Sequence, residues 1–231
     1  MNLVLDNDLS IEVVRTKRRK TASIKVIEGS VQAIVPEKLS DGRVQELITK
    51  RTSWIRKRLR EQSLLVPPKP KEYVNGESFT YLGRNYRLKI LRDDEHGVKL
   101  KRGYLEVCVA QEPSEGDIRN ALVEWYEDHA LDRLKEKTKR YAGIIGVSPN
   151  SIAVRNYKSR WGSCSTKGDI KFNWRIVIAP HHIVDYVVVH ELCHLKHPDH
   201  SSAFWRSVKN EVPDFDVCRQ WLKMHSGHLV V

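Results

Sequence analysis

Residues 183–194 constrain the fold of this chain more than any other segment. An almost wholly apolar run, IVDYVVV, occupies residues 183–189, and the letters HELCH follow directly at 190–194. A segment that is apolar on every helical face needs burial, so we expect it to form a helix in the core. Pro198 cannot continue an α-helix, because its ring clashes with the preceding turn and it has no N–H. We therefore expect the helix to end there.

The histidines of this helix have a spacing that suits a metal ion. His190 and His194 are four residues apart, which places them on one face with Cβ atoms roughly 5–6 Å apart. Two imidazoles so placed can bind one Zn²⁺, whose bonds to histidine nitrogen are about 2.0–2.1 Å. Glu191 is rotated by about 100° from His190, so its carboxylate lies beside the metal and can take a proton from water. The pattern predicts a zinc-dependent hydrolase.

The third ligand has several candidates. We favour His200, because it lies just beyond Pro198, where a chain that reverses can return to the metal. Glu211, on a following helix, and Asp199 are the carboxylate alternatives. His197 would lie about 10.5 Å along a continuing helix from the first histidine, whereas two nitrogens on one zinc are about 3.5 Å apart. Three ligands and an open water position define a catalytic site, and a buried helix without metal is the remaining alternative.

Composition is typical of a soluble intracellular protein. The 231 residues suffice for one large domain or two small ones with a genuine core. The amino terminus has no apolar signal segment, and no apolar stretch approaches the roughly 20 residues that cross a bilayer. The four cysteines occur without a CxxC pair, which is typical of reduced thiols. We therefore expect a cytoplasmic location and no membrane contact.

Positive charge is concentrated towards the amino terminus. The net charge is +11, and residues 1–70 hold 15 Lys and Arg against 8 Asp and Glu, a net of +7. The basic residues cluster in RTKRRK at 15–20 and RKRLR at 56–60. Such clusters suit nucleic acid or nucleotide phosphates, and a solvated basic face is the alternative. Trp54 could stack on a base, but its helical spacing with neighbouring apolar residues favours a place in the core.

Periodicity and turn signals predict an α+β fold in two parts, without an internal repeat. The expected strands are a hairpin at 23–35, two strands at 78–91, and strands near 104–109, 152–155 and 170–178. The expected helices run from 40 or 41 to about 62, from 116 to about 141, through the HELCH motif, and twice more after it. The prolines of PPKP at 67–70 predict an extended linker. We place a β-rich amino-terminal region with a helix at 1–112 and a catalytic domain at 113–231.

Several motifs carry a resemblance to a known family. They are RWGSCS at 160–165, FNW at 172–174, HELCH at 190–194, HS at 200–201 and FW at 204–205. With these motifs the chain resembles the YgjP-like metallopeptidase family, also called DUF45 or the predicted metal-dependent hydrolase family. Amino-terminal matches extend the resemblance over nearly the whole chain; they are RRKT at 18–21, WI at 54–55, GE at 76–77 and YLG at 81–83.

This resemblance has implications for fold and site. It implies a compact zincin-like catalytic domain, related in its metal helix to the SprT and WLM-type proteases that act on DNA-bound proteins. It also implies a zinc cofactor on His190, His194 and His200, with Glu191 as the base. A metallopeptidase acting on protein or peptide substrates is therefore the expected function.

Arg160 is the second candidate catalytic residue. The segment Trp161-Gly162-Ser163 could form a tight turn near the metal, with Arg160 supplying positive charge for a developing oxyanion. Lys158 and Tyr157 are alternatives for this role, and a packed turn without a catalytic role is the structural interpretation.

Two other functions remain as alternatives. The first is a metal-dependent nucleoside triphosphate pyrophosphatase or phosphohydrolase, although the chain has no GxxxxGK[ST] phosphate loop. The second is a nucleic-acid-associated adaptor with a vestigial metal site. This adaptor is disfavoured because Glu191 and all three candidate ligands are intact.

Overall fold

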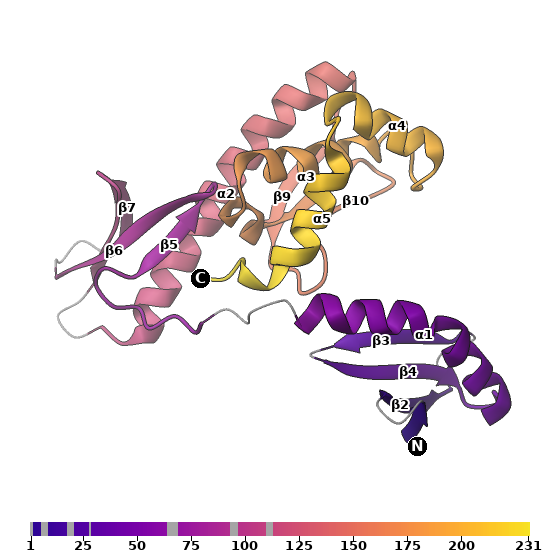
Figure 1. Cartoon of the computed structure of the whole chain (residues 1–231). Coiled ribbons are helices and arrows are strands. Elements are labelled where there is room, and N and C mark those ends of the chain that lie inside the picture. Colours follow the sequence, from indigo (N-terminus) through magenta and orange to yellow (C-terminus); the bar gives the residue numbers. More distant parts are fainter. Residues whose placement is uncertain are drawn as a thin grey trace. The chain divides into compact units, whose positions relative to one another are not determined.

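A computed structural model describes residues 2–5, 9–17, 21–27, 29–63, 69–92, 97–109 and 113–231. Contacts within the chain divide it into two compact units, Met1–Pro67 and Pro68–Val231. Each unit has a hydrophobic core of its own, and Figure 1 follows the elements of both along the chain.

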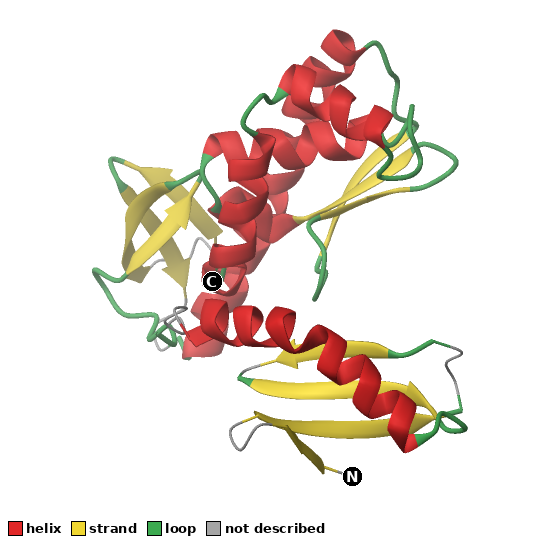
Figure 2. Cartoon of the chain, turned by 45° about the vertical axis from the view of Figure 1, so that its right-hand side comes forward, coloured by secondary structure: helices red, strands yellow, loops and turns green. Residues whose placement is uncertain are grey.

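The first unit consists of a four-stranded sheet and one helix. The elements are β1 (Asn2–Leu5), β2 (Leu9–Thr16), β3 (Ser23–Ile27), β4 (Ser30–Pro36) and α1 (Asp41–Ser63). The strand order is β1-β2-β4-β3, in which the outer pairs are antiparallel and the central pair, β2 with β4, is parallel. Helix α1 lies across one face of this sheet (Figure 2) and contacts β3 and β4.

Alternation along the strands determines the core of the first unit. Its buried residues are alternate side chains of β2 and β4 and one stripe of α1, namely Leu9, Ile11, Val13, Val31, Ala33, Val35, Val44, Ile48 and Ile55. Trp54 is 38% exposed, so the expectation of a core position for it is wrong. Each residue turns a helix by about 100°, and the neighbouring Ile55 occupies the buried face instead.

The second unit begins with a sheet of the same connectivity. Its strands are β5 (Ser78–Tyr81), β6 (Arg84–Arg92), β7 (Gly97–Lys101) and β8 (Tyr104–Val109). The order is β5-β6-β8-β7, again with antiparallel outer pairs and a parallel central pair. A helix, α2 (Glu115–Ile145), follows, as α1 follows the first sheet. The chain therefore repeats a ββββα topology, although its sequence shows no internal repeat.

Helix α2 joins the parts of the second unit. It begins with a capping box, in which the Ser114 hydroxyl accepts from the Asp117 N–H and the Asp117 carboxylate accepts from the Ser114 N–H. It ends at Gly146, whose φ of 72° is the left-handed conformation that glycine favours. Along its 31 residues it contacts β7 and β8 as well as the elements that follow it in the chain. One continuous core therefore spans the whole unit.

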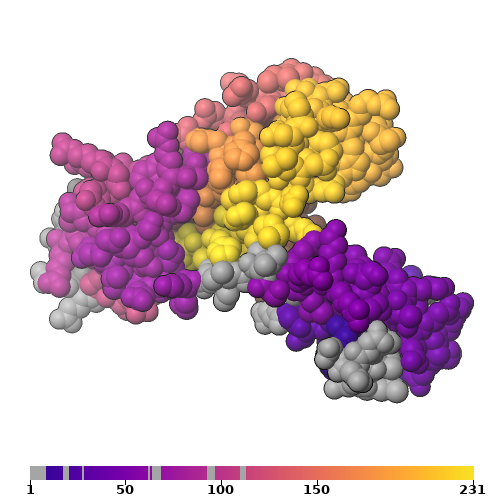
Figure 3. Space-filling view, in the orientation of Figure 1, coloured from indigo at the N-terminus to yellow at the C-terminus, as the bar shows by residue number. Residues whose placement is uncertain are grey.

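The remaining elements surround a buried helix. They are β9 (Ser151–Arg155), β10 (Gly162–Cys164), β11 (Asp169–Asn173), a 3₁₀ helix η1 (Trp174–Ile178), α3 (His181–Cys193), α4 (Ser202–Glu211), α5 (Phe215–His225) and a 3₁₀ turn η2 (Ser226–His228). The sheet order is β10-β11-β9, so β10 is an edge strand. Helix α3 contacts α2, α4, α5 and β10, and the carboxyl-terminal residues form one contiguous surface, gold to yellow in Figure 3.

Most of the expected elements are present, and the α+β class is confirmed. The strand expected at 170–178 is partly wrong, because β11 ends at Asn173 and residues 174–178 form η1. The Asn173 side chain accepts the N–H of Arg175 and so caps this short helix. Strands β1, β2, β7 and β10 are absent from the sequence-based prediction.

The domain boundary expected between residues 112 and 113 falls inside the second unit, between β8 and α2. The observed division lies at the expected PPKP linker, of which residues 67 and 68 are outside the described residues. In the described part of the chain, no helix is both long enough and apolar enough to cross a bilayer.

Two turns of the second sheet provide a matched test of packing. Leu82-Gly83 and Arg102-Gly103 both have positive φ at their two central residues, as type I′ hairpin turns require. A Cβ on Gly83 would be 2.8 Å from the Cα of Pro180, just before α3, whereas Gly103 has nothing within 4 Å.

We expect Gly103→Ala to destabilise the protein by about 1–2 kcal/mol through backbone strain alone. Gly83→Ala adds the collision with Pro180 and is expected to cost more. The comparison is made by thermal unfolding, where about 1 kcal/mol shifts Tm by roughly 2–4 °C in a protein of this size. Equal Tm values for the two variants would contradict the packing of this turn against α3.

Candidate active site

Helix α3 is buried on nearly every side. Between residues 183 and 193 it has eight buried apolar residues and one buried acidic residue, Glu191. The apolar residues are Ile183, Val184, Tyr186, Val187, Val188, Val189, Leu192 and Cys193. The core helix expected for this segment is therefore confirmed. Its expected end at Pro198 is wrong, because the α-helix ends at Cys193. The N–H groups of Leu195 and Lys196 bond three residues back, to Leu192 and Cys193, which tightens the chain into a turn.

Three histidines converge at the end of this helix. Ligand nitrogens of His190, His194 and His200 all lie within 4.8 Å of one another. The Nε2 atoms of His190 and His200 are 3.2 Å apart, close to the roughly 3.4 Å that separates two nitrogens bound to one tetrahedral ion at about 2.0–2.1 Å. Asp199 and Glu211 are not in this group. The three residues named from the sequence are thus the ones that the fold brings together.

The imidazoles are held by hydrogen bonding and by rings of α4. His194 Nδ1 lies 3.1 Å from the carbonyl oxygen of His197, so a proton on Nδ1 leaves Nε2 for a metal, a common arrangement of metal-binding histidines. Phe204 stacks on His194 with ring centroids 4.5 Å apart, and Trp205 stacks on His200 at 5.5 Å. Ser201 begins α4 by accepting from the Phe204 N–H. The start of α4 therefore positions the histidine rings.

Burial favours the neutral form of the His190 and His194 imidazoles. Burial, followed by the effects of His194, His200 and Arg219, lowers the pKa of His190 to about 3. Burial also lowers the pKa of His194. The Nδ1 atom of His190 is buried without a hydrogen-bond partner among the described residues. Neutral imidazole is the form that binds metal ions, so these histidines are suited to binding a metal cation.

Glu191 lies beside the histidines and is 5% exposed. Burial raises the pKa of its carboxyl to about 8, and the positive charge of Arg160 opposes this rise. Gly162 lies directly against it, because a Cβ at this glycine would be 2.5 Å from Oε1 of Glu191 and 2.6 Å from its Cγ. The carboxylate occupies space that any other residue at position 162 would fill.

The segment before β10 brings Arg160 close to Glu191. Instead of the tight turn considered for Trp161-Gly162-Ser163, the chain enters β10 at Gly162 and pairs with β11. The buried Asn173 fixes this entry, since its amide donates to the carbonyls of Tyr157 and Arg160 at 2.9 and 3.3 Å. Its backbone N–H donates to the Trp161 carbonyl at 2.8 Å.

Of the candidates for the oxyanion role, Arg160 has the most favourable position. Two adjoining cavities lie beside Glu191. Arg160 lines both of them, whereas Lys158 and Tyr157 line neither. The Tyr157 hydroxyl instead hydrogen-bonds with the Ser163 hydroxyl at 3.0 Å.

The cleft consists of two adjoining cavities of about 520 and 620 Å³. Both are lined by Arg160, Gly162, His190, Glu191 and His200. The histidines and the carboxylate therefore lie at the junction of the two cavities, where a ligand in either one would meet them.

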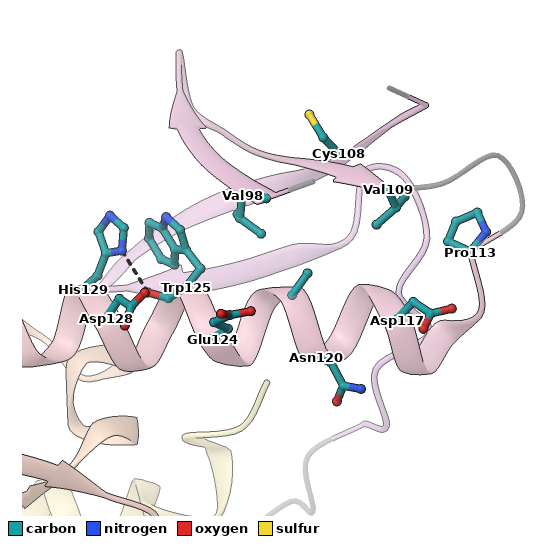
Figure 4. A pocket seen from close by; sticks show the side chains of 12 residues that line it. Val98, Cys108, Val109, Pro113, Asp117, Asn120, Glu124, Trp125, Asp128 and His129 are labelled. Carbon is teal, nitrogen blue, oxygen red and sulfur yellow. Dashed lines mark hydrogen bonds between the residues drawn. The ribbon is translucent and has the colours of Figure 1, made fainter. Parts of the chain in front are cut away.

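A larger cavity of about 800 Å³ lies elsewhere, between α2 and the strands β7 and β8 (Figure 4). Three carboxylates of α2 line it, but among the described residues none of them belongs to a metal-binding group. His129 there stacks on Trp125 at 3.9 Å and lies within hydrogen-bond distance of that residue's carbonyl. Size alone therefore does not locate the site, and the convergence of ligands does.

Comparison with known families gives a match over most of the chain. The model of the YgjP-like metallopeptidase domain matches residues 20–225. The chain belongs to the YgjP-like family. The family assignment makes it a metallopeptidase, that is, a metal-dependent hydrolase of protein or peptide substrates.

Two solved structures also show similarity. The crystal structure of the metallopeptidase zymogen of Pyrococcus abyssi abylysin is 24% identical, with a TM-score of 0.34, over 39% of this chain and 95% of that chain. The corresponding structure of Methanocaldococcus jannaschii jannalysin is 19% identical, with a TM-score of 0.32, over 36% and 90%. A comparison with curated proteins found no match.

Sequence reasoning missed two residues of the site. Gly162 was considered only as part of a turn, and Asn173 only as part of a motif. The signal for both is the pairing of β10 with β11, which places Gly162 opposite Phe172. A prediction of that pairing would have placed Asn173 next to the entry of β10.

Gly162→Ala tests whether the position of Glu191 depends on this contact. The added methyl group must displace the carboxylate, and a shift of about 1 Å can lower turnover roughly 100-fold. We expect peptidase activity of the metal-loaded protein to fall by about that factor while metal content stays unchanged. Gly143→Ala on α2, where a Cβ meets nothing within 4 Å, is the control. Full activity of Gly162→Ala would show that the carboxylate tolerates displacement.

Proposed function

We propose that the chain is a zinc-dependent peptidase with a zincin-like catalytic domain. In this proposal His190, His194 and His200 hold the ion, and Glu191 is the general base. The observation that carries it is the convergence of three imidazoles and one buried carboxylate at the centre of a single cleft. Three protein ligands leave a position open for water, as in catalytic rather than structural zinc sites.

The chemistry requires a base whose proton affinity is suitable near neutral pH. When bound, zinc acts as a Lewis acid and makes water acidic enough to attack a carbonyl at neutral pH. Glu191 alone has a pKa of about 8, and a nearby dication favours its ionised form. The carboxylate can then take the proton of the attacking water and return it to the leaving amine.

Arg160 is proposed to stabilise negative charge on the carbonyl oxygen. It lines both cavities, and in the described part of the chain no carboxylate lies within ion-pair distance of it. A guanidinium without a carboxylate partner can turn its N–H groups towards an oxyanion as charge develops. Arg160 therefore remains the proposed catalytic partner of Glu191.

The edge strand β10 is an observation that favours a polypeptide as the substrate. In the described part of the chain no strand pairs with its outer edge, and its residues Gly162, Ser163 and Cys164 line the cleft. An extended peptide can add to such an edge through main-chain hydrogen bonds, which bind many sequences alike. Bound in this way, the peptide would run past Glu191 from one cavity to the other.

Nucleic-acid binding and a cytoplasmic location stay predictions. Residues 18–20 of the first basic cluster lie outside the described residues, while Arg15 pairs with Asp41. On α1, Arg58 lies 5.8 Å from the exposed Trp54 ring, an arrangement that could contact a base. DNA affinity that does not fall as salt rises would count against a phosphate contact.

The metal assignment predicts which substitutions remove zinc. His194→Ala should lose nearly all zinc, and His200→Ala should lose a large part of it, because each removes one of three ligands. Glu211→Ala is the matched control, since Glu211 follows on α4 but lies outside the histidine group. Zinc per chain is measured by atomic spectroscopy. Full zinc in His200→Ala combined with loss in Glu211→Ala would mean that the third ligand is Glu211.

The base assignment predicts the effect of Glu191→Gln. The amide has a similar size but cannot accept the proton, so hydrolysis should fall by about 10²–10⁴-fold while zinc content and Tm are retained. Turnover is measured for the zinc-loaded protein on casein, on DNA-bound protein and on nucleoside triphosphates. Wild-type turnover by the variant would exclude Glu191 as the base. Hydrolysis of triphosphates alone would favour the phosphohydrolase, and hydrolysis of none of them the adaptor.

A further inference from the structure

The cavity of about 520 Å³ beside Glu191 has an unusual distribution of charge. Three cations line it, Arg160 from the entry of β10 and Arg219 and Lys223 from α5. Glu191 is the acidic residue among those that line it, and its side chain is buried. The open part of the cavity is therefore positively charged.

Arg219 contacts the ring of Trp205, which in turn contacts His200. Its guanidinium lies 5.3 Å from the ring centroid of Trp205, and the Trp205 ring also stacks on His200. Asp216, one turn earlier on α5, approaches Arg219 only to 3.8 Å, and both side chains are more than half exposed. An exposed pair at this distance contributes little, so Arg219 can bind another carboxylate.

The apolar walls suit a side chain rather than a free ion. Tyr186, Trp205 and Leu222 line the cavity together with the cations. Methylene groups can pack on these surfaces while a terminal carboxylate meets Arg219. A planar guanidinium binds a carboxylate through two parallel hydrogen bonds, which fixes its orientation as well as its charge.

We propose that this cavity is a specificity subsite for an aspartate or glutamate side chain of the peptide substrate, with Arg219 as its principal partner. The proposal rests on the peptidase function proposed above. Phosphates of a nucleotide would also suit three cations. The peptide is favoured because the cavity adjoins the edge strand β10, whose unpaired edge suits an extended polypeptide.

The first experiment measures cleavage preference. Zinc-loaded protein is incubated with a peptide library, and the cleaved bonds are identified by mass spectrometry. Asp and Glu should be enriched at one fixed position near the cleaved bond. For a matched pair of peptides with Glu or Gln at that position, kcat/KM should differ by about tenfold or more, as expected for one charge-assisted hydrogen bond.

Variants of Arg219 assign this preference to the cavity. Arg219→Gln should remove the difference between the Glu and Gln peptides, mainly through KM, and Arg219→Glu should reverse it in favour of Lys. Arg206→Gln, an exposed cation of α4 that lines neither cavity, is the control and should keep the preference. An unchanged preference in both Arg219 variants would overturn the proposal.

A binding measurement separates this proposal from the peptidase function. The zinc-loaded Glu191→Gln protein is titrated with the fluorescent Glu and Gln peptides, and anisotropy reports affinity. Tighter binding of the Glu peptide without any cleavage by the wild type would support the subsite and contradict the peptidase. Cleavage with equal affinities would contradict the subsite alone. Displacement of the peptide by a nucleoside triphosphate that the wild type hydrolyses would also overturn it.

Discussion

The site depends on a helix that is buried along almost its whole length. Burial of α3 fixes the direction of its side chains, so His190 near its end and His194 directly after it are held rigidly. The same burial removes Glu191 and His190 from solvent. It raises the pKa of Glu191 and lowers the pKa of His190. Both shifts favour neutral groups, and a bound dication would restore charge to Glu191. The core thus tunes the site as well as supporting it.

Local patterns in the sequence predicted the parts of the site that lie on one element. The apolar run predicted the buried helix, and the spacing of His190 and His194 predicted their shared face. The contact of Gly162 with Glu191 is different, because it joins two elements distant in the chain and leaves no periodic signal. The predicted end of α3 at Pro198 is wrong for a different reason: local hydrogen bonds from Leu195 and Lys196 to carbonyls three residues back end the helix before Pro198. The exposed Trp54 shows that spacing alone does not distinguish adjacent helical faces.

The two sheets show how much topology can be shared without visible sequence similarity. Each has a parallel central pair between two antiparallel hairpins and is followed by a helix. Both helices contact the last two strands of their sheet. Alternating apolar residues are enough to specify such a face, so unrelated side chains can satisfy the same arrangement. In the second unit the helix is extended to reach α3, and this extension connects the sheet to the site.

The three histidines differ in their exposure, and this has a consequence for the lifetime of a bound ion. His190 and His194 come from the buried helix and its end, whereas His200 is exposed and follows the turn. In the proposed metal site, an ion would therefore enter and leave by way of His200, while His190 and His194 stay in place. Its residence time would be set by the opening of a short loop rather than by unfolding of the core. Exchange of one metal for another could then occur in a protein that stays fully folded.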